Sequence, residues 1–318
     1  MDFRWIDLRR DRNQLMLKLQ TLLTASMREF LIERGFIEIH TPKLIGAASE
    51  SGSDVFEVKY FDTKAYLAQS PQFYKQMAMA AGLDRIFETG PVFRAEKSYT
   101  NKHATEFTGF DLEFSYVTSA EDVMKMEEEL LAYTFGKVAA AYGDPIRELF
   151  GKEVIVPSVP FPRIKLKDLY AELETRYGYT VSDDAKGDLT TDAEHLCAKF
   201  SMEKYGSEFL FITDYDAKER AFYHMRDEHG VPMGYDLIWR GCEITTGAVR
   251  EHRYEILKAQ ADEKGLGKDV EFYLQFFRYG GPPHGGFGLG IDRLTMLFLG
   301  LSIKEAEFLF RGPNRLTP

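Results

Sequence analysis

One stretch of the chain, residues 87–117, carries side chains that could bind a nucleotide at one end and a small charged substrate at the other. We predict that it forms strand, loop, strand. Along the second strand, Phe107, Asp111 and Glu113 point to one face, because side chains alternate along a strand. The opposite face is apolar, with Phe110, Leu112, Phe114 and Tyr116. Phe107 and Asp111 would lie roughly 13 Å apart at about 3.3 Å per residue, which would span a base and a small substrate.

The first strand and the loop between the two strands add charge to this segment. Arg94 and Glu96 share one face of the first strand. The polar loop at residues 97–105 follows, and its basic side chains are suited to binding phosphate. These side chains are Lys97, Lys102 and His103.

Three segments, in this order, resemble the three motifs of class II aminoacyl-tRNA synthetases. RGFIEIHTPKL at residues 34–44 is similar to motif 1, and GFGLGIDRL at residues 286–294 is similar to motif 3. FRAE, a polar loop with a late histidine, and EFTGFDLEF together resemble motif 2. Three motifs in the right order are far more specific than one.

Three further signatures narrow the resemblance to the aspartyl-tRNA synthetases of archaeal and eukaryotic form. They are QSPQFYKQ at residues 69–76, YDLIWRGCEITTGAVREH at residues 235–252, and the closing RLTP. The resemblance covers nearly the whole chain, from RWIDLRR to the C-terminus. Enzymes of this family begin with an OB-fold that binds the anticodon, and we expect that module to be missing here. The expected organisation is one catalytic domain over residues 1–318, with a variable helical insertion at about 144–208.

The resemblance implies an ATP site that activates aspartate as aspartyl-adenylate. In it, Arg94 bridges the α-phosphate and the substrate carboxylate, and His103 reaches the terminal phosphate. Glu96 meets the adenine, Phe107 stacks on it, and Arg293 covers its other face while touching the γ-phosphate. An arginine over an aromatic face with a phosphate nearby is favourable on both counts. Arg94 and Arg293 are the expected catalytic residues, because charge accumulates on the phosphates during the reaction.

Two carboxylates, Asp236 and Glu243, are the expected Mg²⁺ ligands within this ATP site. Hard oxygen ligands beside a phosphate suit Mg²⁺. For an arbitrary pair, two solvated carboxylates would be the better interpretation. The seven-residue spacing matches the metal ligands of the family, and Thr246 stands where the family places a hydroxyl group.

The resemblance also implies the residues that bind aspartate: Glu50, Ser70, Gln72, Lys75, Asp111, Thr246 and Arg250. Lys75 and Arg250 would meet the side-chain carboxylate, since fixed cations favour an anionic group over the amide of asparagine. Asparagine-specific relatives lack the lysine of SPQxYKQ. Asp111 would hold Lys75 and meet the substrate ammonium. For Arg250 the alternative is a surface ion pair with Glu251 or Glu255.

Some positions depart from the pattern of the family. The motif 2 loop usually reads SNTxRH, whereas here residues 98–103 read SYTNKH. The usual FPRDP appears as FRGP, and Asp292 replaces the glutamate before Arg293. Together with the missing anticodon module, these changes predict that binding of a tRNA acceptor stem is weak. Three functions stay open: an aspartate–tRNA ligase, a free-standing paralogue that passes activated aspartate to another acceptor such as ammonia, and a non-catalytic regulatory paralogue.

Composition limits the class of protein. The chain has 318 residues and a net charge of −10, which argues against broad, non-specific binding of nucleic acid. The two cysteines, Cys197 and Cys242, have no metal-ligand spacing, so neither zinc nor a disulfide framework is expected and the cytoplasm is the default compartment. No apolar run reaches the roughly 18 residues of a membrane span.

Hydrophobic periodicity predicts an α+β fold, a mainly antiparallel sheet flanked by helices. The predicted helices cover residues 11–34, 70–81, 119–142, 165–177, 191–205, 253–264 and 268–279. The first of these helices and the segment through Pro42 form the homodimer interface in the family. The predicted strands of the second half cover residues 209–213, 221–225, 233–239 and 242–246. The glycine-rich run at residues 280–290 resembles a phosphate-binding loop before a helix.

Overall fold

The computed structural model describes residues 2–46 and 55–317, and its centre is one eight-stranded sheet. In spatial order the strands are β1 (Ile37–Glu38), β5 (Arg85–Phe93), β6 (Glu106–Ser115), β11 (His284–Gly290), β10 (Cys242–Arg250), β9 (Gly234–Trp239), β8 (Phe209–Thr213) and β7 (Arg163–Lys165). All neighbours are antiparallel except the two edge pairs, β1 with β5 and β7 with β8. The mainly antiparallel α+β fold is therefore confirmed.

Helices cover one face of this sheet and bury the core. They are α2 (Asp11–Glu33), α4 (Ala120–Phe150) and α9 (Ile291–Leu299). The apolar face of β6 packs beneath them through Phe110 and Leu112, both fully buried. The other face of β6, β11 and β10 is left for polar side chains.

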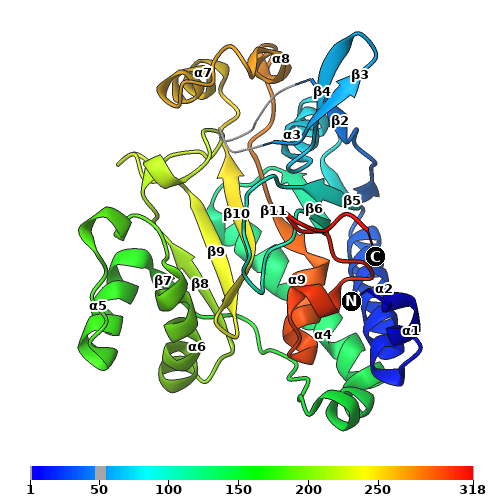
Figure 1. Cartoon of the computed structure of the whole chain (residues 1–318). Coiled ribbons are helices and arrows are strands. Elements are labelled where there is room, and N and C mark those ends of the chain that lie inside the picture. The colour runs from blue at the N-terminus through cyan, green and yellow to red at the C-terminus, as the bar shows by residue number, and fades with distance from the viewer. Residues whose placement is uncertain (1, 47–54, 318) are drawn as a thin grey trace.

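Smaller elements surround the sheet (Figure 1). Helices α5 (Leu166–Tyr177) and α6 (Thr191–Tyr205) stand beside the edge formed by β8 and β7. The remaining elements are α1 (Arg4–Asp7), a small sheet of β2 (Leu44–Ile45), β4 (Thr63–Leu67) and β3 (Glu57–Tyr60), α3 (Gln72–Ala80), α7 (Tyr254–Glu263), α8 (Glu271–Leu274), α10 (Ile303–Ala306), and 3₁₀ turns at Asp183–Ala185, Ala217–Glu219 and Gln275–Phe277. Within the described ranges, none of the helices combines the length and apolarity needed to cross a membrane.

Most predicted elements occur, and the exceptions have local causes. The helix predicted to stop before Gly143 runs on to Phe150, because the C-cap in left-handed conformation is Gly151. The predicted strand at residues 221–225 is absent, and only a single bridge joins His224 to Arg250 there. The helix predicted at residues 268–279 is one short α-turn, α8, followed by a 3₁₀ turn.

Two predictions about the central sheet need correction. The glycine-rich run is not a phosphate-binding loop, because residues 284–290 form β11, a full strand between β6 and β10. The apolar face of β6 ends at Phe114, since Tyr116 has φ of 65° and is 69% exposed.

Candidate active site

The site is built on the open face of three adjacent strands, β6, β11 and β10. Gly288 on β11 lies opposite Asp111 on one side and Thr246 on the other, and Gly286 lies opposite Glu113. A Cβ atom on Gly288 would stand 2.9 Å from Oδ1 of Asp111. The glycines of β11 therefore leave space for acidic and hydroxyl side chains from both neighbouring strands.

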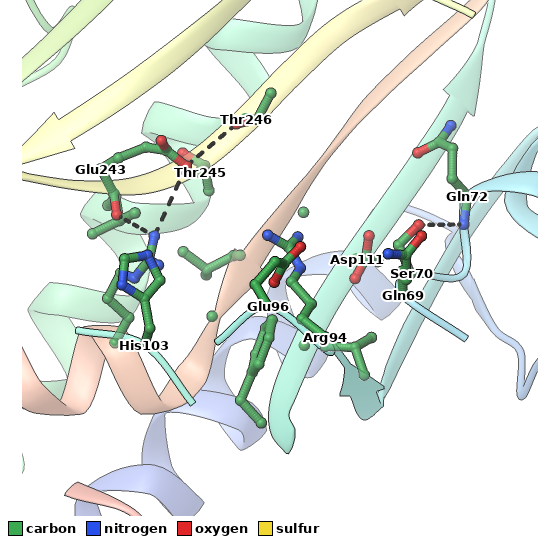
Figure 2. Close-up of a pocket in the computed structure, with 18 of the residues that line it drawn as sticks. Gln69, Ser70, Gln72, Arg94, Glu96, His103, Asp111, Glu243, Thr245 and Thr246 are labelled. Atoms are coloured by element: carbon green, nitrogen blue, oxygen red, sulfur yellow. Dashed lines mark hydrogen bonds and ion pairs between the residues drawn. The ribbon is translucent and has the colours of Figure 1, made fainter. Parts of the chain in front are cut away.

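A pocket of about 520 Å³ lies over these strands (Figure 2). The predicted site residues that line it are Ser70, Gln72, Arg94, Glu96, His103, Phe107, Asp111, Glu243, Thr246, Arg250 and Arg293. In Figure 2 the side chains of Ser70 and Gln72 lie near one end and that of Glu243 near the other, with Arg94 between them. The predicted residue Glu50 lies outside the described residues.

The end near Ser70 holds two buried cations between two carboxylates. The Lys75 ammonium lies 3.0 Å from Asp111 Oδ1 and 3.3 Å from Glu113 Oε2. Arg250 donates its Nε–H to Glu113 Oε1 at 3.0 Å. Burial alone would raise the pKa of Glu113, but the charges of Arg250 and Lys75 outweigh it and lower this pKa. Both cations are thus fixed in place before any substrate enters.

Arg250 is part of the site rather than a surface ion pair. Its side chain is 4% exposed and also donates to the Gly286 carbonyl at 3.0 Å. Glu251, the alternative partner, pairs instead with Arg253 at 2.7 Å. Burial opposes the charge of Arg250, yet the neighbouring Glu113 outweighs it and raises the pKa of the guanidinium.

Lys75 stands behind the pocket wall. It is completely buried on α3 and is absent from the pocket lining, to which its partner Asp111 contributes. The start of α3 is set by Ser70, whose Oγ accepts the backbone N–H of Gln72 at 3.1 Å. The Gln72 side chain is held by Gln76 at 3.0 Å.

The other end of the pocket carries aromatic and basic groups suited to a nucleotide. The Arg94 guanidinium carbon lies 5.6 Å from the centroid of the Phe107 ring, within the range of a cation–π contact. Arg293, on α9, donates to the Glu243 carbonyl at 2.7 Å. Both arginines line the pocket with Glu96, although Arg94 and Glu96 follow the end of β5 rather than lying on the predicted strand.

The surroundings of His103 favour its neutral form. Its Nδ1 lies 3.1 Å from Ser98 Oγ and 2.5 Å from Thr100 Oγ1. Burial, followed by the charges of Arg293, Lys102 and Arg94, lowers its pKa to about 4. A bound phosphate would favour the protonated form, because an opposite charge nearby stabilises it.

The two predicted metal ligands differ in their surroundings. Asp236 is fully engaged: Arg220 donates to its two oxygens at 2.9 and 2.6 Å, and the Thr246 hydroxyl donates to Oδ1 at 2.9 Å. Glu243 is half-buried and lines the pocket. Burial of its carboxyl group and the charge of Asp236 raise the pKa of Glu243 to about 7.

Three residues that line the pocket were not predicted from the sequence. Arg220 lines the pocket and lies with its guanidinium carbon 3.5 Å from the Tyr215 ring centroid, but its segment was predicted as the approach to a strand. Tyr223 and His224 also line the pocket. No local sequence pattern marks these residues. Arg220 pairs with Asp236, and His224 forms a bridge with Arg250, so their contacts depend on the folded chain.

The departure at Asp292 is structurally compensated. Asp292 Oδ2 accepts the backbone N–H of Thr108 at 2.7 Å, and Oδ1 accepts the Gln20 side chain at 3.0 Å. The shorter aspartate therefore still ties α9 to β6 and α2 beside the nucleotide end of the pocket.

Comparison with known proteins agrees with this geometry. Residues 1–310 match the family model of class II tRNA synthetases (D, K and N). The chain is 41% identical to the aspartate–tRNA(Asp/Asn) ligase of Aeropyrum pernix, over all of this chain and 72% of that protein. It is 40% identical to the aspartate–tRNA(Asp) ligase of Pyrococcus furiosus, over all of this chain and 73% of that protein.

Solved structures with the same fold include both aspartyl and asparaginyl enzymes. The aspartyl-tRNA synthetase of Entamoeba histolytica superimposes with a TM-score of 0.88 at 35% identity, over all of this chain and 62% of that one. The asparaginyl-tRNA synthetase of Pyrococcus horikoshii, complexed with asparaginyl-adenylate, gives a TM-score of 0.90 at 34% identity, over all of this chain and 73% of that one. The motifs, the sheet and these relatives lead to one conclusion: the chain belongs to the class II tRNA synthetases of the D, K and N type.

Proposed function

We propose that this chain is an ATP-dependent aspartate–tRNA ligase. In the first step, an oxygen of the aspartate α-carboxylate attacks the α-phosphorus of ATP. The bond to the β-phosphate oxygen breaks, so aspartyl-adenylate forms and pyrophosphate leaves. In the second step, a hydroxyl group of the terminal ribose of tRNA attacks the activated carbonyl and AMP leaves. The observation that carries the proposal is the preformed pair of buried cations, Lys75 and Arg250, at one end of a pocket whose other end suits a nucleotide.

The chain's own groups provide positioning and charge. Arg94 and Phe107 would hold the adenylate portion, and Arg293 would neutralise charge that accumulates on the phosphates. Glu96 is positioned to meet the adenine, and His103 to meet the terminal phosphate. No general base is required, because the attacking α-carboxylate is already ionised at neutral pH.

At the amino-acid end, Lys75 and Arg250 would attract the side-chain carboxylate of aspartate. Asp111, which lines the pocket, would accept the substrate ammonium while it keeps Lys75 in place. Ser70 and Gln72 complete this end of the pocket, and Glu50 is proposed to close over the amino acid as in the family. With asparagine, the side-chain amide would direct N–H groups toward cations, which leaves charged groups unpaired.

The residues present fit a divalent cation such as Mg²⁺. Burial and the charge of Asp236 raise the pKa of Glu243, and a cation bound beside this carboxyl group would favour its ionised form. Glu243 and the oxygen of Thr246 would hold the ion, and Asp236 would polarise that hydroxyl while it is paired to Arg220. In the described part of the chain no three acidic, histidine or cysteine side chains cluster as a complete metal cage. Phosphate oxygens would therefore complete the coordination, and the ion would neutralise their charge.

We further propose that the chain works as a cytoplasmic homodimer through α2 and residues 34–44, which include β1. Three apolar side chains of α2 and of residues 34–44 stay exposed: Ile32, Ile37 and Leu44, at 58%, 51% and 48%. Exposed apolar groups gathered over one surface favour association.

One assay tests the reaction itself. Aspartate-dependent exchange of labelled pyrophosphate into ATP is expected with the purified chain, followed by transfer of labelled aspartate to tRNA. Absence of exchange at saturating aspartate and ATP would refute the proposal. Exchange without transfer to tRNA, together with release of asparagine when ammonia is supplied, would instead identify a ligase with a non-tRNA acceptor.

A further inference from the structure

The helical insertion at residues 144–208 reaches the nucleotide end of the pocket through α6. Its contact point is the tight turn between β9 and β10, where Gly241 has φ of 74°. A Cβ on Gly241 would lie 3.3 Å from the Cα of His195 and from the methyl group of Ala198. The helix therefore packs directly against the turn from which the strand carrying Glu243 begins.

One side chain of α6, Glu194, enters this contact as a buried carboxylate. It is 5% exposed, although it lies in the first turn of a helix whose neighbours Asp192 and His195 are exposed. Its Oε1 accepts the backbone N–H of Glu243 at 2.5 Å. Its Oε2 lies 2.5 Å from the ammonium of Lys102.

Glu194 thus joins two segments of the site that are far apart in sequence. Lys102 belongs to the loop at residues 97–105, which also carries His103, and both residues line the pocket. The far side of this loop is held by backbone contacts to the C-terminal segment, from Ile303 N–H to the Asn101 carbonyl at 2.8 Å and from Thr105 N–H to the Arg311 carbonyl at 3.0 Å. Glu194 supplies the anchor on the sheet side.

A purely structural role would not require this arrangement. A carboxylate buried for packing alone costs free energy unless it is paired. Here the pairing partners are the side chain of a loop that lines the pocket and the backbone of a proposed metal ligand. The charges facing Glu194 come from Lys102, and Arg293 and His103 lie near the same loop.

We propose that Glu194 is a positioning residue for the nucleotide half of the site, supplied by the insertion. It holds the loop with His103 and the start of β10 with Glu243 at a fixed separation, so that both meet the triphosphate without prior rearrangement. The inference rests on the proposed function. It assigns no role to Glu194 at the aspartate end, where Lys75, Asp111 and Arg250 form a separate network.

Three variants separate the two contacts. Glu194→Gln keeps an oxygen that can accept the Glu243 N–H but removes the charge that pairs with Lys102. Glu194→Ala removes both contacts. Glu203→Gln is the matched control, because Glu203 lies on the same helix with its side chain 45% exposed.

The measurements are the KM values for ATP and for aspartate in pyrophosphate exchange, and the affinity for ATP alone by calorimetry. Because Glu194→Gln loses the charge that holds Lys102 and its loop, we expect this variant to raise the KM for ATP about tenfold. The KM for aspartate should stay within about twofold, and Glu194→Ala should weaken ATP binding further. Glu203→Gln should match the parent chain in both KM values.

A second experiment tests Lys102, the residue that pairs with Glu194. If the ion pair carries the effect, the Lys102→Met/Glu194→Gln double variant should have the same KM for ATP as Lys102→Met alone, because effects of paired residues are not additive. The inference is overturned if Glu194→Gln changes only the unfolding midpoint, or if the KM values for ATP and aspartate rise together. If the parent chain shows no exchange, the proposed function fails, and the calorimetric affinity for ATP still decides the role of Glu194.

Discussion

Lys75 is the residue whose surroundings say most about the substrate. Its side chain is completely buried, and both carboxylates within 3.3 Å are themselves nearly inaccessible. A buried ammonium is retained only where its charge is compensated. Since Arg250 shares one of these carboxylates, two cations and two anions form a neutral unit that an incoming aspartate can join through its ammonium and its side-chain carboxylate.

Removing the ammonium should relax the choice of amino acid. For Lys75→Met, we expect kcat/KM for aspartate in pyrophosphate exchange to fall by about 10²-fold or more, because Asp111 and Glu113 lose a shared partner. The preference for aspartate over asparagine should shrink in parallel, and Arg250→Gln should act in the same direction.

The control for this prediction is Lys64→Met. Lys64 is another lysine that pairs with a carboxylate, Glu57 at 2.9 Å, but its side chain is 65% exposed. Exposed ion pairs contribute little, so this variant should behave as the parent chain. Equal use of asparagine by the parent, or unchanged preference in both Lys75→Met and Arg250→Gln, would contradict the assignment.

A second buried carboxyl group, Glu127 on α4, lies beneath the site and should govern how stability depends on pH. It is fully buried and accepts the hydroxyl groups of Tyr235, at 2.6 Å, and Thr245. Burial raises its pKa from the ordinary value of 4.5 to about 8. Between these pH values the folded chain holds a proton that the unfolded chain has released, so stability falls as pH rises.

Glu127→Gln should remove this contribution. Below pH 4.5 the two chains should differ little in their dependence on pH, and between pH 4.5 and 8 the variant should lose less stability, by up to roughly 1.4 kcal/mol for each pH unit. Urea unfolding at several pH values measures the difference. Glu129→Gln, a half-buried neighbour on the same helix, is the control. A parallel pH dependence of Glu127→Gln and the parent would refute the raised pKa.

For individual residues, the sequence predicted which side chains line the pocket far better than it predicted their ion pairs and hydrogen bonds. The motifs named Asp236 and Glu243 together as metal ligands, and in the structure Glu243 lines the pocket whereas Asp236 is paired with Arg220. The difference comes from Arg220, which is 16 positions from Asp236 along the chain. Partner choice over such separations depends on the assembled sheet and cannot be read from local spacing.

Among the elements, β11 decides the shape of the pocket floor. Its glycines face the carboxylates of β6, and the strand has almost no side chains on that face to obstruct them. The sequence singled out the glycine-rich run at residues 280–290, but it predicted a phosphate-binding loop where the structure has a strand. Glycine-rich runs before a helix occur both as loops and as strands, and only the pairing with β6 and β10 distinguishes them.

Adding one methyl group to this strand should therefore damage substrate binding. In Gly288→Ala the new Cβ would meet Asp111 Oδ1 at 2.9 Å, so Asp111 must leave its place beside Lys75. We expect the KM for aspartate to rise about tenfold or more while the chain still folds, since the clash falls on the end of a side chain.

Gly136→Ala is the matched control, measured by the same exchange assay and by thermal unfolding. Gly136 lies within α4, and a Cβ there would meet nothing within 4 Å. Because alanine favours a helix over glycine by about 0.8–1.0 kcal/mol, this variant should be more stable than the parent and equally active. An unchanged KM for aspartate in Gly288→Ala would contradict the proposed position of Asp111.

Helix periodicity was reliable in the middle of elements and poor at their ends. It correctly predicted α2 and the start of α4, where Ser119 and Asp122 form a capping box. It failed at Gly143, because a glycine ends a helix only where the backbone turns left-handed, as at Gly151. Packing of α4 against α2 and the sheet stabilises the helix beyond Gly143, where the local sequence predicted its end.

For the whole molecule, the proposed dimer gives the simplest test. Ile37→Asp would place a charge in an apolar surface that we expect to be covered by a second copy of the chain. Sedimentation should show a dimer for the parent at micromolar concentration and a shift to monomer for the variant.

Ile155→Asp is the control, because Ile155 is equally exposed, at 51%, but lies in the connection after α4. It should sediment as the parent does. A monomeric parent, or equal dissociation by both substitutions, would exclude an interface at α2 and β1.

The aromatic packing around β9 has a practical consequence for spectroscopy. The chain has two tryptophans. Trp239 is fully buried against the rings of Phe135 and Phe298, with both centroids at 4.9 Å, whereas Trp5 is 55% exposed. A Trp5→Phe variant would thus leave a single indole at the joint between the sheet and the helical layer. The fluorescence of Trp239 would report unfolding of the core without added labels. Because Trp239 ends β9, it would also report on the turn between β9 and β10 that contacts α6.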